Sequence, residues 1–497
     1  MDYLQITMII FAYITLIIYL AAQTYIAAFC LMQIHLLFKY YKNEKCSELV
    51  EMTDESLPFV TVQLPIFNEM YVVERLIDNI TKFDYPKDKY EIRVLDDSTD
   101  ETVDITARKV AEYKAKGFQI EHVLREDRKG YKAGALKEDM KHAKGEFFAI
   151  FDADFLPKPD FLRRTIPHFK DPEIGVVQTR WGHINEDYSI ITKLQAFQLN
   201  VHFTVEQVGR ENGNYFLQFN GTGGVWRKKT IEDAGGWEAD TLTEDLDLSL
   251  RAQLKGYKIF YLEKTVSPAE LPAEMNGLKS QQHRWMKGGA ETAKKLLPKV
   301  WKADLGFGKK FHATLHLLSS SIFLCVFVVG IFSVPVLFLL DTIHFNAQYF
   351  AIFLTSMLSI VAVYYVGNVK VAWADGDRKH NIWKFLFLFP VFLALSMGLS
   401  LHNSIAVLQG YRGKKSPFVR TPKFNIKDIS DKINKKQYLA TRIPFTTVLE
   451  GLLSLYFVAA IFMSIKVGSL EFLFFHILLA IGYGTICFFS IKHLTLK

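Results

Sequence analysis

The sequence predicts an α/β domain with a mostly parallel sheet, inserted between transmembrane helices. Long apolar blocks lie near both ends of the 497-residue chain, and short apolar runs alternate with charged helical stretches between them. Repeated strand–helix–strand patterns are typical of parallel sheets, whereas blocks of roughly 20 apolar residues can cross a bilayer. Half of the residues are hydrophobic while 22% are charged, a mixture that suits neither a purely soluble enzyme nor a bare transporter.

An apolar run from about residue 6 to residue 38 opens the chain. The run is longer than the apolar region of a cleavable signal peptide, and no basic segment precedes it. Lys39, Lys42 and Lys45 follow it directly, and basic residues of this kind mark the cytoplasmic end of a span. We therefore expect residues 1–45 to form a signal anchor that leaves the next domain in the cytoplasm.

Residues 55–300 are expected to form this cytoplasmic domain. The predicted buried strands are 60–64, 91–95 and 147–151, and the predicted helices between them are 71–83 and 101–116. Ligands of parallel sheets bind beyond the carboxyl ends of the strands. The polar residues that follow these strands should therefore meet in one crevice. Helices around 275–300 are expected to lie at the membrane interface.

The C-terminal region, residues 310–497, contains five apolar blocks. They lie at about 312–340, 347–373, 384–410, 446–467 and 470–491. The connection 411–444 holds ten Lys or Arg against two Asp, which predicts a cytoplasmic loop. Because the domain and this loop are then on the same side of the membrane, an even number of spans must lie between them. Three apolar blocks lie between them, so one block should not cross the membrane. We expect block 384–410 not to span, because Pro390 can break it and its end is polar, which leaves about four C-terminal spans.

Asp152 and Asp154 follow the predicted strand 147–151. Two carboxylates one residue apart at a strand end can share a hard divalent cation that also binds substrate phosphates. Oxygen ligands of this kind suit Mg²⁺ or Mn²⁺. An isolated pair is more often part of a turn, but the preceding strand and the neighbouring motifs favour a metal site.

Polar residues also follow the other two predicted strands. Asp96 and Asp97 come after the strand 91–95 and could hydrogen-bond a base or a ribose. Asn68 and Glu69 come after the first strand and could close over the same nucleotide. A structural turn explains this second pair equally well.

Arg128 and Lys132 stand beside two glycines, Gly130 and Gly134. Glycine permits close approach of a ligand to the backbone, and the cations suit a diphosphate. A basic surface loop that leads into a helix is an equal alternative.

Glu244 and Asp245 lie at the start of a predicted helix. Capping by Thr243 and the helix dipole explain part of this acidity. A carboxylate here can also act as a general base that takes the proton of an attacking hydroxyl group. Asp245 is the expected base, and Glu244 is the alternative.

Gln281, Arg284 and Trp285 form a further group. An arginine suits a leaving diphosphate, and an indole can stack on a sugar ring. A Trp and Arg pair at the membrane interface is the alternative. Further candidates for the wall of an acceptor site, each with an equally plausible structural role, are Asn220, Gly221, Thr222 and Trp237.

With these motifs in place, the chain resembles the membrane-embedded family-2 glycosyltransferases, which include cellulose, chitin and hyaluronan synthases. The shared motifs are the Asp pair, DxD, TED and QxxRW. The strings at 219–226, 234–237 and 281–285 are most similar to those of cellulose-synthase-like mannan and glucomannan synthases. The basic loop is similar to the FxVTPK gating loop of cellulose synthases through Phe418, Thr421 and Lys423, whereas Arg420 replaces a Val of that family.

The resemblance implies a GT-A catalytic domain and an inverting mechanism. The donor would be UDP-glucose or GDP-mannose, with a divalent metal held by Asp154 and Asp152. The acceptor would be a growing β-linked polysaccharide that passes through the membrane helices. This implies an integral membrane protein, in the plasma membrane if the chain is prokaryotic, with the bilayer and no nucleic acid as partners. The sugar, the linkage and the oligomeric state stay open.

Two alternatives remain. Non-processive enzymes that add one sugar to a lipid, such as relatives of ceramide glucosyltransferase, share similar motifs. A transporter or scaffold without catalytic activity would explain the apolar blocks but would leave the acidic constellation unexplained.

Overall fold

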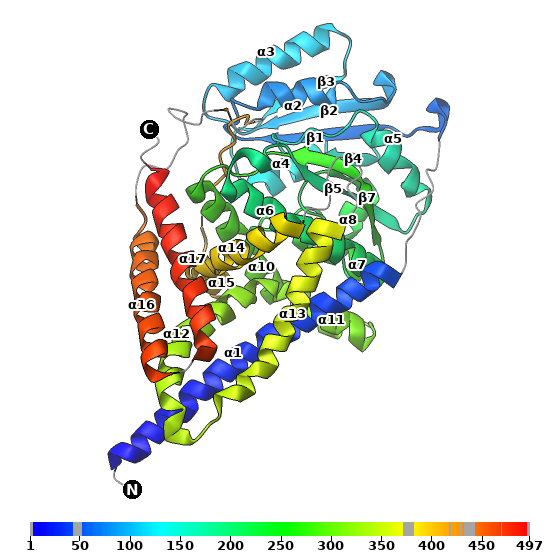
Figure 1. Cartoon of the computed structure of the whole chain (residues 1–497). Coiled ribbons are helices and arrows are strands. Elements are labelled where there is room, and N and C mark those ends of the chain that lie inside the picture. The colour runs from blue at the N-terminus through cyan, green and yellow to red at the C-terminus, as the bar shows by residue number, and fades with distance from the viewer. Residues whose placement is uncertain are drawn as a thin grey trace.

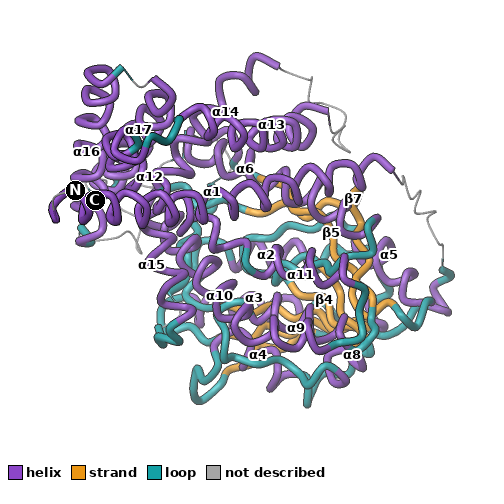
Figure 2. The backbone as a smooth tube through the Cα atoms, turned by 90° about the horizontal axis from the view of Figure 1, so that it is seen from below, coloured by secondary structure: helices purple, strands orange, loops and turns teal. Residues whose placement is uncertain are grey.

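The computed structural model describes residues 3–42, 52–370, 382–416, 419–426, 430–431, 443–468 and 470–494. A seven-stranded sheet and its helices form one end of the molecule, and long apolar helices extend from it (Figure 1). Seen from below, the strands gather on one side and helices α14, α16 and α17 on the other (Figure 2). The predicted α/β domain between apolar helices is confirmed.

The sheet has the strand order β3-β2-β1-β4-β6-β5-β7. The strands are β1 Val60–Ile66, β2 Tyr90–Asp96, β3 Ile120–Leu124, β4 Phe147–Ile150, β5 Ile174–His183, β6 Gly224–Arg227 and β7 Lys258–Ala269. Neighbouring strands are parallel except at β6, which is antiparallel to both β4 and β5. The three predicted strands are confirmed as β1, β2 and β4. They could be recognised because nearly every residue along them is buried.

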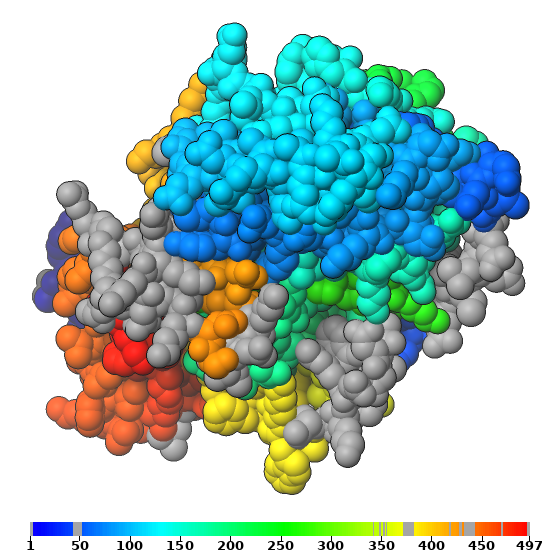
Figure 3. Space-filling model, turned by 90° about the horizontal axis from the view of Figure 1, so that it is seen from above, coloured from blue at the N-terminus to red at the C-terminus, as the bar shows by residue number. Residues whose placement is uncertain are grey.

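Helices connect the strands of this sheet, and two more follow its last strand. They are α2 Val73–Ile80, α3 Thr102–Ala115, α4 Tyr131–Asp139, α5 Phe161–Thr165, α6 Ile190–Val201, α7 Gln207–Asn212, α8 Lys228–Asp233, α9 Glu244–Leu254, α10 Met275–Lys302 and α11 Phe307–Leu317. The predicted helices 71–83 and 101–116 correspond to α2 and α3. Both belong to the blue and cyan part of the chain that covers much of the upper face in Figure 3.

Seven helices make up the apolar part of the described chain. They are α1 Tyr3–Lys42, α12 Ile322–Leu339, α13 Ala351–Tyr365, α14 Ile382–Gly398, α15 Ser400–Tyr411, α16 Phe445–Val467 and α17 Leu473–Lys492. Four helical stretches among the described residues are long and apolar enough to cross a membrane: Tyr3–Lys42, Ser319–Leu339, Phe445–Val467 and Leu473–Lys492. Helix α1 runs beside α12 and α13, and α16 runs beside α17 (Figure 1).

Block 384–410 forms a bent pair of helices, because α14 and α15 meet at an angle of 47°. The predicted place of the break was wrong: Pro390 lies inside α14, and the chain turns at Leu399. After the turn, α15 packs along α10 of the domain, where His402 Nε2 lies 2.8 Å from the carbonyl oxygen of Lys279. The polar end of the block thus makes hydrogen-bonding contacts with the domain. Whether the pair crosses the bilayer stays a prediction.

A buried ion pair joins the domain to the membrane helices. Lys279 of α10 lies 2.8 Å from one carboxylate oxygen of Glu450 on α16 and 2.9 Å from the other. The Lys279 side chain is 4% exposed and that of Glu450 is fully buried. Removing one partner of such a pair leaves an uncompensated buried charge.

We expect Glu450→Gln to lower the free energy of unfolding by about 3–5 kcal/mol, as is typical when one partner of a buried ion pair is removed. Thermal unfolding of the detergent-purified protein measures the change. Replacing both residues with Met should recover much of the stability, because the isolated charge disappears with its partner. An unaltered melting temperature in Glu450→Gln would contradict the assigned pairing.

Candidate active site

One cavity of about 1140 Å³ lies between the carboxyl ends of the strands and the apolar helices. Most of the predicted site residues line it. These are Glu69, Asp97, Arg128, Lys132, Asp152, Asp154, Asn220, Gly221, Glu244, Asp245, Gln281, Arg284, Trp285, Thr421 and Lys423. The crevice expected beyond the strand ends is therefore present, and it holds residues from motifs more than 300 positions apart.

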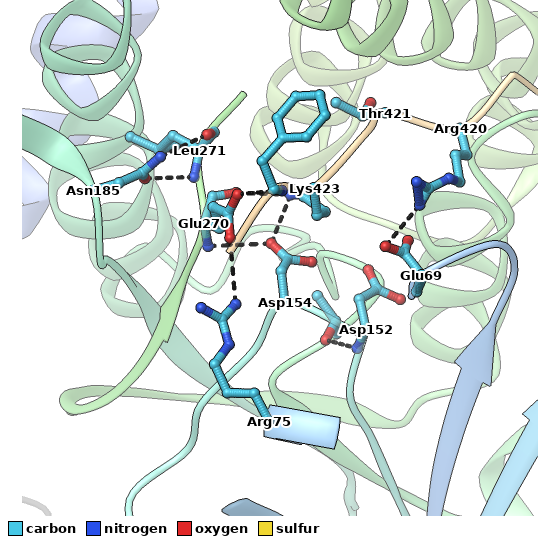
Figure 4. A network of polar contacts seen from close by, with 12 residues as sticks. Glu69, Arg75, Asp152, Asp154, Asn185, Glu270, Leu271, Arg420, Thr421 and Lys423 are labelled. Atoms are coloured by element: carbon cyan, nitrogen blue, oxygen red, sulfur yellow. Dashed lines mark hydrogen bonds and ion pairs between the residues drawn. The ribbon is translucent and has the colours of Figure 1, made fainter. Parts of the chain in front are cut away.

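The two acids that follow β4 each face a lysine. Lys132 Nζ lies 2.5 Å from Asp152 Oδ1 and also donates to the carbonyl oxygen of Gly221 over 2.9 Å. Lys423 Nζ lies 2.6 Å from Asp154 Oδ2 (Figure 4). The Asp152 side chain is 37% exposed and that of Asp154 only 8%. Asp152 is thus the more accessible of the two.

The donor set of Asp152 and Asp154 fits a hard divalent cation, because both offer carboxylate oxygens to the same cavity. A second acidic group, formed by Glu238, Asp240 and Asp247, also lies within metal-binding geometry. There Lys295 Nζ lies 2.6 to 2.9 Å from an oxygen of each of the three carboxylates, so an ammonium group already occupies the centre of the group. Among the described residues, the pair after β4 is the better metal site.

Glu244 and Asp245 are the first two residues of α9. Thr243 occupies the capping position, but its side chain makes no capping bond and instead contacts the hydroxyl of Thr292, contrary to the expected cap. Burial, and then the charge of Glu244, raise the pKa of Asp245 to about 7. Burial also raises the pKa of Glu244, while Lys132 opposes the shift. A carboxylate that titrates near neutral pH is well suited to general-base catalysis.

Two residues expected to bind the nucleotide lie outside the cavity lining. Asp96 is buried, where it accepts a bond from the Ser98 amide over 2.9 Å and lies 2.9 Å from His122 Nε2. Asn68 has a φ of 55°, and its side-chain oxygen accepts a bond from the Thr99 amide over 2.8 Å. Both residues hold the loops after β1 and β2 in shape, and a direct contact of either with a ligand stays a prediction.

Two residues expected in the acceptor wall also lie elsewhere. Trp237 is 2% exposed and packs edge-on against Trp226 in the core, with ring centroids 5.6 Å apart. Thr222 is fully buried, and its hydroxyl accepts the amide hydrogen bond of Asp152 over 2.9 Å. These positions correct the expected acceptor contacts, because neither side chain reaches the cavity surface. Asn220 and Gly221 do line it.

Residues 419–426, which we term the docked segment, lie against the cavity. Arg284 donates to the carbonyl oxygen of Val419 over 2.9 Å and to the Thr421 hydroxyl over 3.0 Å. The Phe424 amide donates to Glu270 Oε1 over 2.7 Å. Phe418, the first residue of the predicted gating motif, lies outside the described residues.

Comparison with known proteins identifies the domain. Residues 58–288 match the family described as "Glycosyltransferase like family 2". This stretch contains all seven strands and every acid of the candidate site. It is a family-2 glycosyltransferase domain.

Plant enzymes are among the similar curated proteins. "Glucomannan 4-beta-mannosyltransferase 1" of Oryza sativa subsp. japonica is 43% identical over 268 residues, covering 53% of this chain and 51% of that protein. "Glucomannan 4-beta-mannosyltransferase 2" of Arabidopsis thaliana is 42% identical over 267 residues, covering 53% and 50%. The chain thus spans about half the length of the curated relatives it matches.

A solved structure shares the fold of the glycosyltransferase domain and its neighbouring helices. It is a mannosyltransferase from Pyrobaculum calidifontis, solved in complex with GDP-Man and Mn²⁺. The TM-score is 0.55 at 19% sequence identity, over 80% of this chain and 99% of the other. The predicted GT-A-type fold is thereby confirmed.

Several residues of the glycosyltransferase domain that shape the site were not predicted. Arg125 donates from Nε to Asp97 Oδ1 over 2.8 Å, and Glu270 bonds through its amide to Asp154 Oδ2 over 3.2 Å. Both follow the carboxyl ends of strands, β3 and β7, so recognition of these strands would have found them. His202 Nε2 lies 2.9 Å from Asn220 Oδ1. His202 begins a π-helical turn, His202–Glu206, for which the sequence gives no comparable signal.

Glu69 is the remaining predicted residue with a notable environment. It is paired with Arg420, whose Nη1 lies 2.7 Å from Glu69 Oε2. Burial raises the pKa of Glu69 to about 8, although Arg420 opposes the shift. Glu69 is therefore a carboxyl group with a raised pKa that lies beside the docked segment.

Proposed function

We propose that this chain transfers a hexose from a nucleotide sugar to a growing β-linked glycan at the membrane and passes the product between its apolar helices. The observation that carries the proposal is the extent of the cavity. Its lining continues from Asp245 and Arg284 to residues of α1, α12, α13, α14 and α17. A chain elongated at Asp245 would therefore enter the membrane region without crossing bulk solvent.

GDP-mannose is the donor that the relatives favour, with UDP-glucose as the alternative. The similar plant enzymes are named mannosyltransferases, and the structural neighbour was solved with GDP-Man. At the nucleotide end of the cavity, Arg128 and Lys132 would bind the diphosphate. Asp97 would contact the nucleoside.

The proposed mechanism is a single displacement with inversion. Asp245 takes the proton of the acceptor hydroxyl group while the hydroxyl oxygen bonds to the anomeric carbon of the donor sugar. The bond from that carbon to the diphosphate oxygen breaks, and Arg284 stabilises the departing anion. Trp285 would stack on the acceptor sugar. When Mg²⁺ or Mn²⁺ is bound, Asp152 and Asp154 would hold it, and the cation would supply further charge for the diphosphate.

The reaction should depend on pH through Asp245. Its pKa is raised to about 7, so the carboxylate form that can accept a proton increases as the pH rises through 7. We expect kcat/KM to rise between pH 6 and about pH 8 and then to level off. An unperturbed Asp, with a pKa near about 3.9, would give a flat profile in this range. Initial rates of nucleotide diphosphate release at constant Mn²⁺ measure it.

A donor and product screen tests the proposal. Purified full-length protein in lipid nanodiscs is incubated with Mn²⁺ and each common UDP- or GDP-sugar, and release of nucleotide diphosphate is measured. We expect release with GDP-mannose or UDP-glucose, and a labelled product that a β-mannanase or β-glucanase degrades. No release with any of these donors would overturn the proposed activity.

A glycolipid product is the second candidate, because the membrane end of the cavity is mostly apolar. Its walls there include Val329, Phe350, Phe353 and Leu478, which suit a hydrocarbon chain as well as the faces of sugar rings. A labelled product that extracts into chloroform and carries one sugar would favour this candidate. A water-insoluble polymer that resists chloroform extraction would exclude it.

A further inference from the structure

Among the arginines that line the cavity, Arg420 lies within electrostatic range of both Arg128 and Arg284. The Arg128 side chain is 26% exposed and that of Arg420 is 10% exposed. Like charges gathered in a partly desolvated site repel one another unless anions lie between them. The described residues must therefore provide counter-ions, or a bound ligand must.

Acids of this chain face the cations of the cavity. Glu69 lies 2.7 Å from Arg420. Asp152 pairs with Lys132, and Asp154 pairs with Lys423. Asp152 and Asp154 are also the residues whose chemistry fits a divalent cation. Glu69 differs from them, because it pairs with an arginine rather than a lysine. A guanidinium presents a planar fork that matches two phosphate oxygens.

The position of Arg420 follows from the residues on each side of it. The carbonyl oxygen of Val419 and the hydroxyl of Thr421 both accept hydrogen bonds from the guanidinium of Arg284. Arg420 thus lies on a short stretch of chain held against the arginine that is expected to stabilise the departing diphosphate. Its side chain points into the cavity towards Glu69 (Figure 4).

We propose that Arg420 is a ligand of the donor's diphosphate, and that Glu69 is the counter-ion from which it is released when the diphosphate binds. The inference rests on the proposed function, since it requires a nucleotide diphosphate sugar as donor. A diphosphate carries more negative charge than one carboxylate and offers paired oxygens to the guanidinium. It therefore competes effectively with Glu69 for Arg420.

A purely structural role makes a different prediction. If Arg420 served only to fasten the docked segment to Glu69, loss of either partner would have the same effect on nucleotide binding. A diphosphate ligand with a competing counter-ion requires opposite effects. Loss of Arg420 should weaken binding, whereas loss of the Glu69 charge should strengthen it.

The test measures binding of GDP and of UDP to the full chain by calorimetry in the presence of Mn²⁺. We expect Arg420→Met to raise the Kd for the better nucleotide by about tenfold or more, as is typical for loss of a charged hydrogen bond. Guanosine or uridine, which lack phosphates, should bind Arg420→Met and the unmodified chain equally. At a pH above about 8, where Glu69 is ionised, Glu69→Gln should lower the Kd for the diphosphate, and it should have no effect when Arg420 is already Met.

Arg412→Met is the matched control, because Arg412 is exposed and lies outside the cavity lining. It should leave the Kd unchanged. An unchanged Kd in Arg420→Met, or shifts of the same sign in Arg420→Met and Glu69→Gln, would overturn this inference but not the proposed function. If the unmodified chain bound neither nucleotide, the proposed function would fail and the inference with it.

Discussion

Replacing Asp245 with Asn is expected to lower kcat by about 10²- to 10⁴-fold, the usual contribution of general-base catalysis. The amide cannot accept the acceptor's proton, although it keeps nearly the same shape at the start of α9. Binding of the nucleotide diphosphate should change little. Calorimetric Kd values and rates of diphosphate release, measured on the same preparation, separate the two effects.

Glu244→Gln is the matched control for this experiment, because Glu244 is the neighbouring residue and also lines the cavity. Its loss should reduce the rate less than the loss of Asp245. A near-normal rate in Asp245→Asn together with a large loss in Glu244→Gln would assign the base to Glu244. Loss of the pH dependence near 7 in Asp245→Asn would independently support Asp245.

Asp154→Ala is expected to abolish the dependence of nucleotide binding on Mn²⁺. In the unmodified chain, we expect the diphosphate to bind more tightly with Mn²⁺ than with EDTA. Loss of an outer-shell partner of a metal ligand typically weakens metal affinity by roughly 10- to 100-fold. Loss of a carboxylate that binds the metal directly should weaken it more. The two Kd values should therefore converge in the variant. The measurement is calorimetry with and without the metal.

Asp160→Ala is a suitable control, because Asp160 also follows β4 but does not line the cavity. It should retain the response to Mn²⁺. Asp154→Asn separates the loss of charge from the loss of side-chain volume and should behave like Asp154→Ala. Metal-dependent binding that survived both substitutions would contradict the assigned metal site.

Much of the fold was predictable because its central strands are buried along their whole length. The runs that form β1, β2 and β4 are short, carry apolar residues at most or alternate positions, and are followed by acids or turns. Strand β3 is buried only at Ile120, and its other positions, which include Glu121 and His122, are intermediate or exposed. Such a pattern is less distinct than a continuous apolar run. The bend at Leu399 depends on the contacts of α15 with α10, which local sequence does not reveal.

The candidate site likewise contains residues that the sequence predicts and residues that it does not. Asp152, Asp154 and Asp245 could be placed because each follows a recognisable strand or begins a recognisable helix. The ion pair between Lys423 and Asp154 joins positions 269 residues apart, so no local pattern predicts it. Trp237 was misplaced because its burial against Trp226 depends on packing between separate segments.

The buried pair of Lys279 and Glu450 bears on the order in which the protein is made. The ribosome completes the glycosyltransferase domain and α10 well before it reaches α16, since the paired residues are 171 positions apart. Until α16 arrives, Lys279 has no carboxylate from that helix, and closing the domain against the apolar helices would bury an isolated charge. We therefore expect the domain to dock fully against the apolar helices only after α16 has been made, and a chain truncated before α16 should lack this ion pair.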